Sequence, residues 1–148
     1  MAKERYPAVG RPQQVHGGGP VTSAAFVLTI DDPTRFDDSR RVGSWIGLCP
    51  RRDASGDSNP ELGIHKSGDC HLRRLLVQCA QYVLGPCGKG SELRRFGLRL
   101  VAQRGRTAKR KALTAVAREA GRATASHLAT RPGLRPFHNT TRQAAMAV

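Results

Sequence analysis

The sequence is poor in aromatic residues and lacks any long apolar run. Aromatics make up 5% of the 148 residues and hydrophobic residues 39%, so we expect one domain with tails and a modest core. The longest apolar stretch, near residues 24–30, is too short to span a bilayer. The N-terminus also lacks the charged-then-apolar layout of a secretory signal. These absences predict a cytoplasmic protein without a membrane partner.

The cysteines do not have the spacing of a zinc site. They stand at positions 49, 70, 79 and 87, and no pair is separated by two residues. His65, Cys70 and His71 are close in sequence, but His65 falls in an expected loop and the other two open an expected helix. We therefore predict no metal site in this chain. Cys79 fits a core position, and the other cysteines are expected to be free thiols in a reducing cytosol.

Acidic residues are nearly absent from the second half of the chain. Residues 1–72 carry nine basic and nine acidic side chains, whereas residues 73–148 carry sixteen basic side chains and only Glu92 and Glu119. The formal net charge of +14 therefore comes from one half. A field of one sign favours a polyanion through counterion release, so nucleic acid is the expected partner. A merely solvated basic surface is the alternative, and an anionic membrane surface is a weaker one.

Hydrophobic periodicity predicts a mainly α, small helical domain. Residues 21–30 are apolar at nearly every position, which does not separate a helix from a buried strand, but Pro20 favours a helix and Asp31-Asp32-Pro33 ends it. Three basic amphipathic helices follow the middle of the chain, and a short helix capped by Ser39 precedes them. The expected helices cover 20–30, 39–46, 69–83, 92–104 and 107–128, with an apolar stripe that fades beyond Gly121. Trp45 is interpreted as a core anchor rather than a base-stacking platform.

A glycine-rich turn precedes the first helix. The pattern Gly17-x-Gly19-Pro20 is similar to the hairpin of a helix-hairpin-helix module, in which glycine amides and a helix N-terminus face a DNA phosphate. Gly17 and Gly19 are thus candidate DNA-binding residues. Gly18 stands where such a module has an apolar residue, and a simple flexible turn explains these residues equally well.

A polar loop over residues 51–68 separates two of the expected helices. It places Ser55 before Gly56, close to Arg51 and Arg52, with Lys66 near its end. A serine that attacks a phosphodiester needs nearby cations and a backbone that allows close approach. Ser-Gly in a polar loop is nevertheless most often a turn.

Basic residues stand in the first turns of two expected helices. They are Arg73 and Arg74 in one helix and Lys109, Arg110 and Lys111 in the other. The positive end of a helix disfavours cations unless an anion lies nearby. We therefore expect these side chains to contact phosphate.

Several short motifs keep the order and spacing of a known family. They are Gly19 to Ser23, Ile30 to Phe36, Ser39 to Ser44, Gly47-Leu48, Pro50 to Asp57, Lys66 to Asp69 and Leu72 to Leu76. Residues 12–105 strongly resemble the C-terminal domain of bacterial insertion-sequence transposases of the 116/110/902 group. Weaker similarity continues through the helix that carries Lys109 to Lys111.

The resemblance implies a DNA-cutting and rejoining enzyme. Family members join an RNase-H-like domain, whose acidic residues bind a divalent metal such as Mg²⁺, to a helical domain with a nucleophilic serine that forms a phosphoserine intermediate. The serine of the family motif matches Ser55, and Ser58 is the second candidate. Arg51, Arg52 and Lys66 are our own candidates for charge stabilisation. The resemblance also implies oligomers, nucleoid association and, in some members, an element-encoded structured RNA as a partner.

The sequence departs from this family in two ways. The RNase-H-like domain has no counterpart, so we expect a truncated transposase that keeps DNA affinity but has little or no activity alone. The segment beyond residue 121 also lacks the family's long apolar helix. We divide the chain into a disordered lead-in (1–11), the serine-nucleophile domain (12–105), a basic helix (106–128) and a disordered tail (129–148). The alternative function is a non-enzymatic basic helical module that binds nucleic acid.

Overall fold

The computed structural model describes residues 17–32, 35–51, 62–103, 105 and 107–128, which form a bundle of five helices. In chain order these helices are α2 (Pro20–Ile30), α3 (Ser39–Trp45), α4 (Cys70–Leu84), α5 (Glu92–Ala102) and α6 (Ala108–Leu128). The described residues contain no strand and only one isolated β-bridge, between Pro50 and Ile64. The expected mainly α fold is therefore confirmed.

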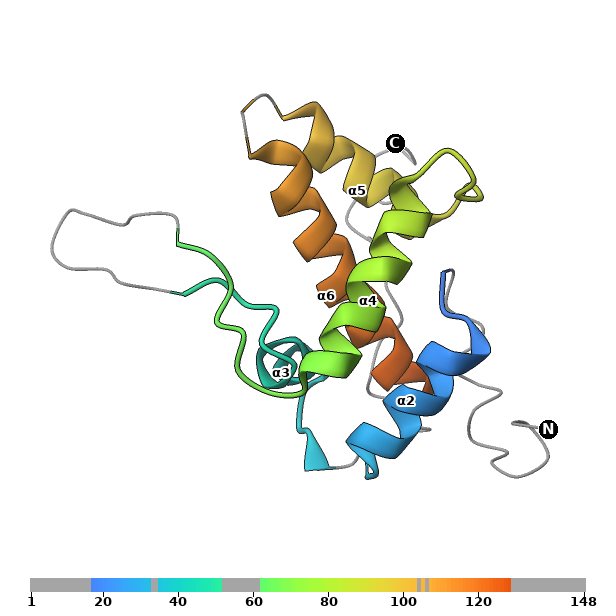
Figure 1. The fold of residues 1–148 in the computed structure, drawn as a ribbon, viewed down its shortest axis with the longest axis vertical. Helices are drawn as coiled ribbons and strands as arrows, with labels where there is room; N and C mark the ends of the chain where they lie inside the picture. Colours follow the sequence, from blue (N-terminus) through green and yellow to red (C-terminus); the bar gives the residue numbers. More distant parts are fainter. Residues whose placement is uncertain (1–16, 33–34, 52–61, 104, 106, 129–148) are drawn as a thin grey trace, which may run out of the picture.

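Helix α6 is the central element of the bundle. It packs against α5, α4, α3 and, at its far end, α2, while α2 packs mainly against α4. Figure 1 shows α4 and α6 side by side, with α5 at one end of the pair and α2 and α3 at the other. Its 21 residues give α6 a length of about 30 Å. The two ends of the bundle are thus separated by most of that length.

The helix boundaries follow local capping chemistry. Asp69 accepts a hydrogen bond from the Leu72 amide at the start of α4, and Ser91 accepts one from Arg94 at the start of α5. The prediction for α3 was one residue late, because the cap is Asp38, whose side chain accepts from the Arg40 amide. A carboxylate caps that end and also offsets its partial positive charge. Ser39 is instead buried as the first residue of α3.

The core lies where α2, α3 and α4 meet α6. Its largest fully buried side chains are Phe26, Ile30, Ile46, Leu48, Leu72, Leu76, Val42 and Val116. Trp45 packs against the rim of this cluster, as expected for a core anchor, and Cys79 is buried as predicted. The other three cysteines are free, and two of them are exposed.

The second half of α6 is buried although its side chains are small. We expected the stripe to fade beyond Gly121, but Gly121, Thr124 and Ala125 are buried there. A methyl group added at Gly121 would lie 3.2 Å from a Leu76 methyl and 3.4 Å from an Ile46 methyl. Small residues let α6 approach α4 and α3 closely, which a search for large apolar side chains overlooks.

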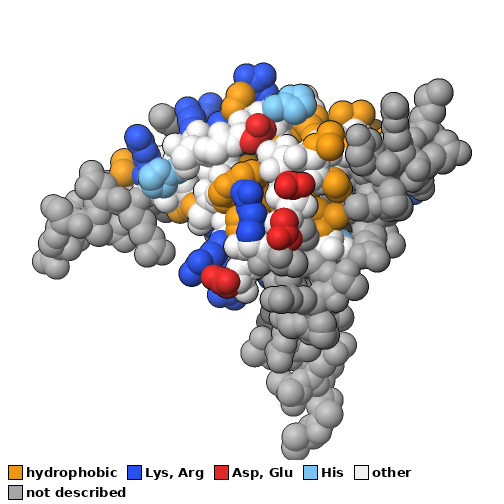
Figure 2. Space-filling model, turned by 90° about the horizontal axis from the view of Figure 1, so that it is seen from below, with side chains coloured by type: hydrophobic (Ala, Val, Ile, Leu, Met, Phe, Trp, Pro, Cys, Tyr) orange, Lys and Arg blue, Asp and Glu red, His pale blue; other side chains and the backbone are white. Residues whose placement is uncertain are grey.

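The α2–α3 end of the molecule carries charges of both signs. Figure 2 looks onto this end and shows acidic side chains near the middle of the face, with Lys and Arg among them and hydrophobic side chains around. The exposed aspartates of this region are Asp31, Asp32, Asp37 and Asp38. In the described part of the chain, no helix combines the length and the apolar character needed to cross a membrane.

Candidate nucleic-acid interface

The polar loop is joined to the helices by a hydrogen-bonded stem. We call residues 47–51 and 62–68 the stem. The Arg51 amide donates to the Gly63 carbonyl (3.0 Å), the His65 amide to Cys49 (2.9 Å) and the Lys66 amide to Gly47 (3.1 Å). Pro50 and Ile64 pair in an antiparallel bridge. The two sides of the stem therefore run together up to Arg51 and Leu62, and Figure 1 shows them projecting from the body. Arg52, Ser55 and Ser58 lie outside the described residues.

Two glycines hold the foot of the stem against α3. Gly47 (φ +77°) and Gly68 (φ +82°) adopt the left-handed conformation that glycine tolerates best. A Cβ at Gly47 would lie 2.0 Å from the Ser67 carbonyl oxygen, and one at Gly68 would lie 2.0 Å from that of Trp45. The backbones of these segments touch, which fixes the stem relative to the helices.

Arg73 and Arg74, which the sequence treats alike, lie in different surroundings. Arg73 is half-buried, and its guanidinium donates to the Ile46 carbonyl (2.9 Å) and the Ser67 carbonyl (3.0 Å). It therefore ties α4 to both α3 and the stem. Arg74, the next residue of α4, is exposed. Arg51 and Lys66, which lie on the stem, are also exposed. Lys66 has a positive φ of 58°, so it stands at a tight bend of the backbone.

The glycine turn before α2 packs against α4. A Cβ at Gly17 (φ +91°) would lie 2.7 Å from a Val83 methyl and 3.1 Å from the Cys79 carbonyl oxygen. Close packing therefore accounts for Gly17. Gly19 is the exposed N-cap of α2, with no side-chain cap and with open space around it. Of the two glycines, Gly19 has the amide neighbourhood that a phosphate could approach.

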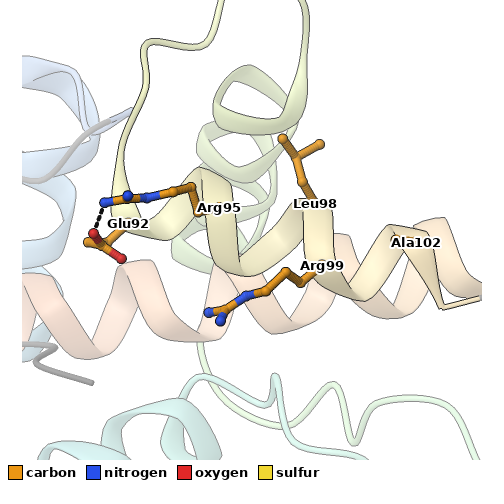
Figure 3. Close-up of a pocket in the computed structure, with 5 residues that line it drawn as sticks. All are labelled: Glu92, Arg95, Leu98, Arg99 and Ala102. Atoms are coloured by element: carbon orange, nitrogen blue, oxygen red, sulfur yellow. Dashed lines mark ion pairs between the residues drawn. The ribbon is translucent and has the colours of Figure 1, made fainter. Parts of the chain in front are cut away.

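A second group of cations lies at the α5–α6 end. Lys109, Arg110 and Lys111 are exposed in the first turn of α6, as the sequence predicts. A shallow hollow on α5 is lined by Glu92, Arg95, Leu98, Arg99 and Ala102. Figure 3 shows Arg95 paired with Glu92, and Arg99 extending toward the same side of α5 without joining that pair. Arg95 and Arg99 were not among the site residues predicted from the sequence.

Arg94 has a structural role that its sequence neighbourhood does not reveal. It is half-buried, and its guanidinium donates to the carbonyls of Val83 and Gly85, both at 2.5 Å. These carbonyls belong to the C-terminal end of α4, where backbone acceptors lack helical partners. Arg94 thus caps α4 from α5.

No gathering of metal ligands occurs in the described ranges. There, no three His, Cys, Asp or Glu side chains come together in a way that could hold an ion. The described residues therefore do not form a site for the divalent metal that the family resemblance implies elsewhere in the enzyme. No step proposed below uses a metal on these residues.

The sequence of this chain matches the model of a known protein family. Residues 12–96 match the model of the transposase IS116/IS110/IS902 family. This match covers more than half of the chain. The chain therefore belongs to this family of insertion-sequence transposases, as its motifs predict.

Individual relatives carry transposase names. The chain is 32% identical over 90 residues to a probable family 20 transposase of Pseudomonas aeruginosa, covering 61% of this chain and 27% of that protein. It is 39% identical over 67 residues to the transposase for insertion sequence element IS1328 of Yersinia enterocolitica, covering 45% and 20%. It is 36% identical over 74 residues to the transposase for IS1111A of Coxiella burnetii, covering 50% and 20%. The chain thus matches 20–27% of the length of these relatives.

Proposed function

We propose that this chain is the DNA-binding, serine-nucleophile part of an insertion-sequence transposase. The main support is the family match over residues 12–96, which includes the polar loop. The stem adds a physical reason, because its hydrogen bonds hold the two ends of the loop at one place. Catalytic residues commonly lie on loops held by a rigid scaffold. Residues 12–105 would form this domain, and 106–128 a basic helix joined to it.

In this proposal Ser55 is the nucleophile, with Ser58 as the second candidate. The Ser55 oxygen bonds to phosphorus, the bond from phosphorus to one sugar oxygen breaks, and that sugar leaves as a hydroxyl. A hydroxyl of another DNA strand then attacks the phosphoserine, and the serine is released. Ser55 follows Arg51 by four residues, so the chain keeps it within about 14 Å of the end of the stem.

The cations around the stem would stabilise the charge on phosphorus. Arg51, Lys66 and Arg74 are exposed and come from both sides of the stem and from the first turn of α4. Arg52 is adjacent to Arg51 in sequence and belongs to the same proposal. Donors fixed before the reaction stabilise a developing charge without reorganisation. Arg73, in contrast, would act by holding the stem in place.

The α5–α6 end would bind a further part of the nucleic acid. Lys109, Arg110 and Lys111 form an exposed basic turn at the positive end of a helix, which favours phosphate. Arg99 and Arg95 extend this surface along α5. DNA is the partner that the family implies, and an element-encoded structured RNA and other copies of the enzyme are further partners in this proposal. We expect the activity of the 148 residues alone to be low, since they match 20–27% of the length of the three relatives named above.

Two measurements test the proposed function. Fluorescence anisotropy with duplex DNA, at salt concentrations from about 50 to 200 mM, should show affinity that falls steeply with salt. Affinity that does not respond to salt would contradict the basic-surface model. Element-end DNA mixed with the full-length family enzyme should form a covalent adduct that Ser55→Ala abolishes. An adduct that persists in Ser55→Ala and disappears in Ser58→Ala would move the nucleophile to Ser58.

A non-enzymatic nucleic-acid-binding module is the second candidate function. The observation in its favour is that the exposed cations of the first turn of α6 lie at the other end of the bundle from the stem. In that case the chain should bind RNA and DNA alike, and Ser55→Ala should alter neither binding nor any covalent product. A serine-dependent adduct rejects this second candidate.

A further inference from the structure

The guanidinium of Arg35 lies against two aromatic rings. Its central carbon is 4.9 Å from the ring centroid of Phe36 and 4.7 Å from that of Trp45. The two rings meet edge to face, with centroids 5.8 Å apart and an interplanar angle of 71°. Cations are attracted to aromatic faces, so the two rings together hold the position of the Arg35 guanidinium.

The hydrogen-bond donors of this guanidinium have no protein acceptor among the described residues. Arg35 is exposed, and the ion pairs and hydrogen bonds of that part of the chain do not include its side chain. Two of the acidic residues nearest in sequence, Asp37 and Asp38, have other partners. Asp37 pairs with Arg41 at 3.0 Å, and Asp38 caps α3. A fixed guanidinium with free edges suits a group that accepts two parallel hydrogen bonds, such as phosphate.

Trp45 connects this guanidinium to the foot of the stem. Its ring contacts the Arg35 guanidinium, and its carbonyl oxygen would lie only 2.0 Å from a Cβ on Gly68. Gly68 is two residues beyond the exposed Lys66, and Ser67 between them accepts a hydrogen bond from Arg73. Arg35 therefore belongs to the same rigid corner of the molecule as the base of the polar loop.

We propose that Arg35, held against the rings of Phe36 and Trp45, binds a backbone phosphate of the nucleic acid at the foot of the stem. This inference rests on the proposed function, since it assigns an additional contact for the same substrate. Contacts with the rings do not use up the N–H donors of the guanidinium, so these donors remain for the phosphate oxygens. The contact is to phosphate, so it orients the strand at the stem without reading its sequence.

The test compares three variants of the full chain binding to duplex DNA. Arg35→Ala should lower the affinity about tenfold, as for the loss of one charge-assisted contact. It should also reduce the slope of log affinity against log salt by about 0.9. Arg35→Lys keeps the charge but not the planar fork, so its affinity should fall between those of Arg35→Ala and the wild type. Arg41→Ala is the matched control, because it removes the same charge from a side chain already paired with Asp37.

Trp45 supplies a local readout, because it is the only tryptophan of the chain. In the wild type, its emission should change as DNA is added, with the same midpoint as the anisotropy titration. In Arg35→Ala, DNA that still binds through the other cations should leave the emission unchanged. Circular dichroism of each variant before titration shows that the helices are intact.

The outcomes separate this inference from the proposed function. Salt-dependent DNA binding that Arg35→Ala leaves unaltered, or binding without any change in wild-type Trp45 emission, overturns the Arg35 contact and leaves the proposed function standing. Absence of DNA binding contradicts the proposed function instead. Titration with RNA and with pyrophosphate then decides the inference: an Arg35-dependent change in Trp45 emission supports the phosphate site, and no change with either ligand overturns it.

Discussion

The Arg73 guanidinium donates a hydrogen bond to the Ile46 carbonyl at 2.9 Å, which joins the first turn of α4 to the end of α3. A second bond from the same nitrogen atom reaches Ser67, on the returning side of the stem. One side chain thereby joins the start of α4 to the end of α3 and to the stem. Its neighbour Arg74 is exposed and is the cation of this turn that is open to a ligand.

Replacing Arg73 should affect mainly the stability of the fold, whereas replacing its neighbour Arg74 should affect mainly DNA binding. Arg73→Ala should lower the free energy of unfolding by about 2 kcal/mol, because two carbonyls lose a charged donor. Arg74→Ala should change it by less than about 0.5 kcal/mol but should reduce the salt slope of DNA binding by about 0.9. Urea denaturation and salt-dependent anisotropy measure the two quantities. An unchanged stability of Arg73→Ala would show that Arg73 does not hold the stem.

Gly68 is expected to be intolerant of any side chain. Gly68→Ala places a methyl group against the Trp45 carbonyl oxygen in a backbone with φ of +82°, so the free energy of unfolding should fall by about 2 kcal/mol or more. Gly90→Ala is the control, because a Cβ there would meet open space. Thermal or urea unfolding compares them. Equal stabilities would mean that the foot of the stem is not closely packed.

The buried thiol of Cys79 predicts a dependence of stability on pH. Burial raises the pKa of Cys79 above its ordinary value, despite an opposing hydrogen bond to Thr22. The unfolded chain therefore loses this proton at lower pH than the folded chain. Its contribution to stability is complete below the ordinary cysteine pKa and is lost as the pH rises toward the folded value.

Unfolding free energies measured from pH 7 to pH 10 should show this loss, with a slope no steeper than about 1.4 kcal/mol per pH unit. Cys79→Ala should remove that part of the slope, whatever its effect on stability at neutral pH. Cys87→Ala should retain it, since Cys87 is exposed. Identical slopes in all three proteins would contradict the assignment to Cys79.

The cations in the first turn of α6 should lower the stability of the fold and strengthen the binding of DNA. Replacing Lys109 and Arg110 by Ala removes two cations from the positive end of a helix, so the free energy of unfolding at low salt should rise by about 0.5–1 kcal/mol. The same change should lower the salt slope of DNA binding by about 1.8. Lys89→Ala, on an exposed loop, serves as the single-charge control. Lower stability and unchanged binding would give this turn a structural role.

The sequence predicts most of the helical fold because each helix carries its own boundary signals. Asp69 and Ser91 are N-caps, Gly85-Pro86 follows α4, and Pro20 opens α2, so the signals act within a few residues. The family assignment is also accessible, since it rests on motifs that keep their order. The α3 cap differs, because Asp38 stands beside an equally suitable serine, and α5 ends at Ala102 rather than at residue 104.

The contacts of the candidate interface are not accessible in the same way. Arg73 and Arg74 have the same charge, and only the fold directs Arg73 to carbonyls that are 27 and 6 residues away. Arg94 reaches α4 for the same reason, and Arg35 meets Trp45 only when α3 has formed. Long side chains take their roles from tertiary distances, which local patterns do not contain. Ser55 remains a prediction from the family motif, outside the described residues.

The hydrogen bond between the Arg51 amide and the Gly63 carbonyl has a consequence for how this domain can vary. Segment 52–61 begins and ends at a junction that is already closed, so a change in its length alters the folding free energy through ring-closure entropy. Doubling the number of residues there would cost only about 0.6 kcal/mol. Sequence between these two positions can be lengthened, shortened or exchanged for that of another transposase while the helices beneath keep their packing.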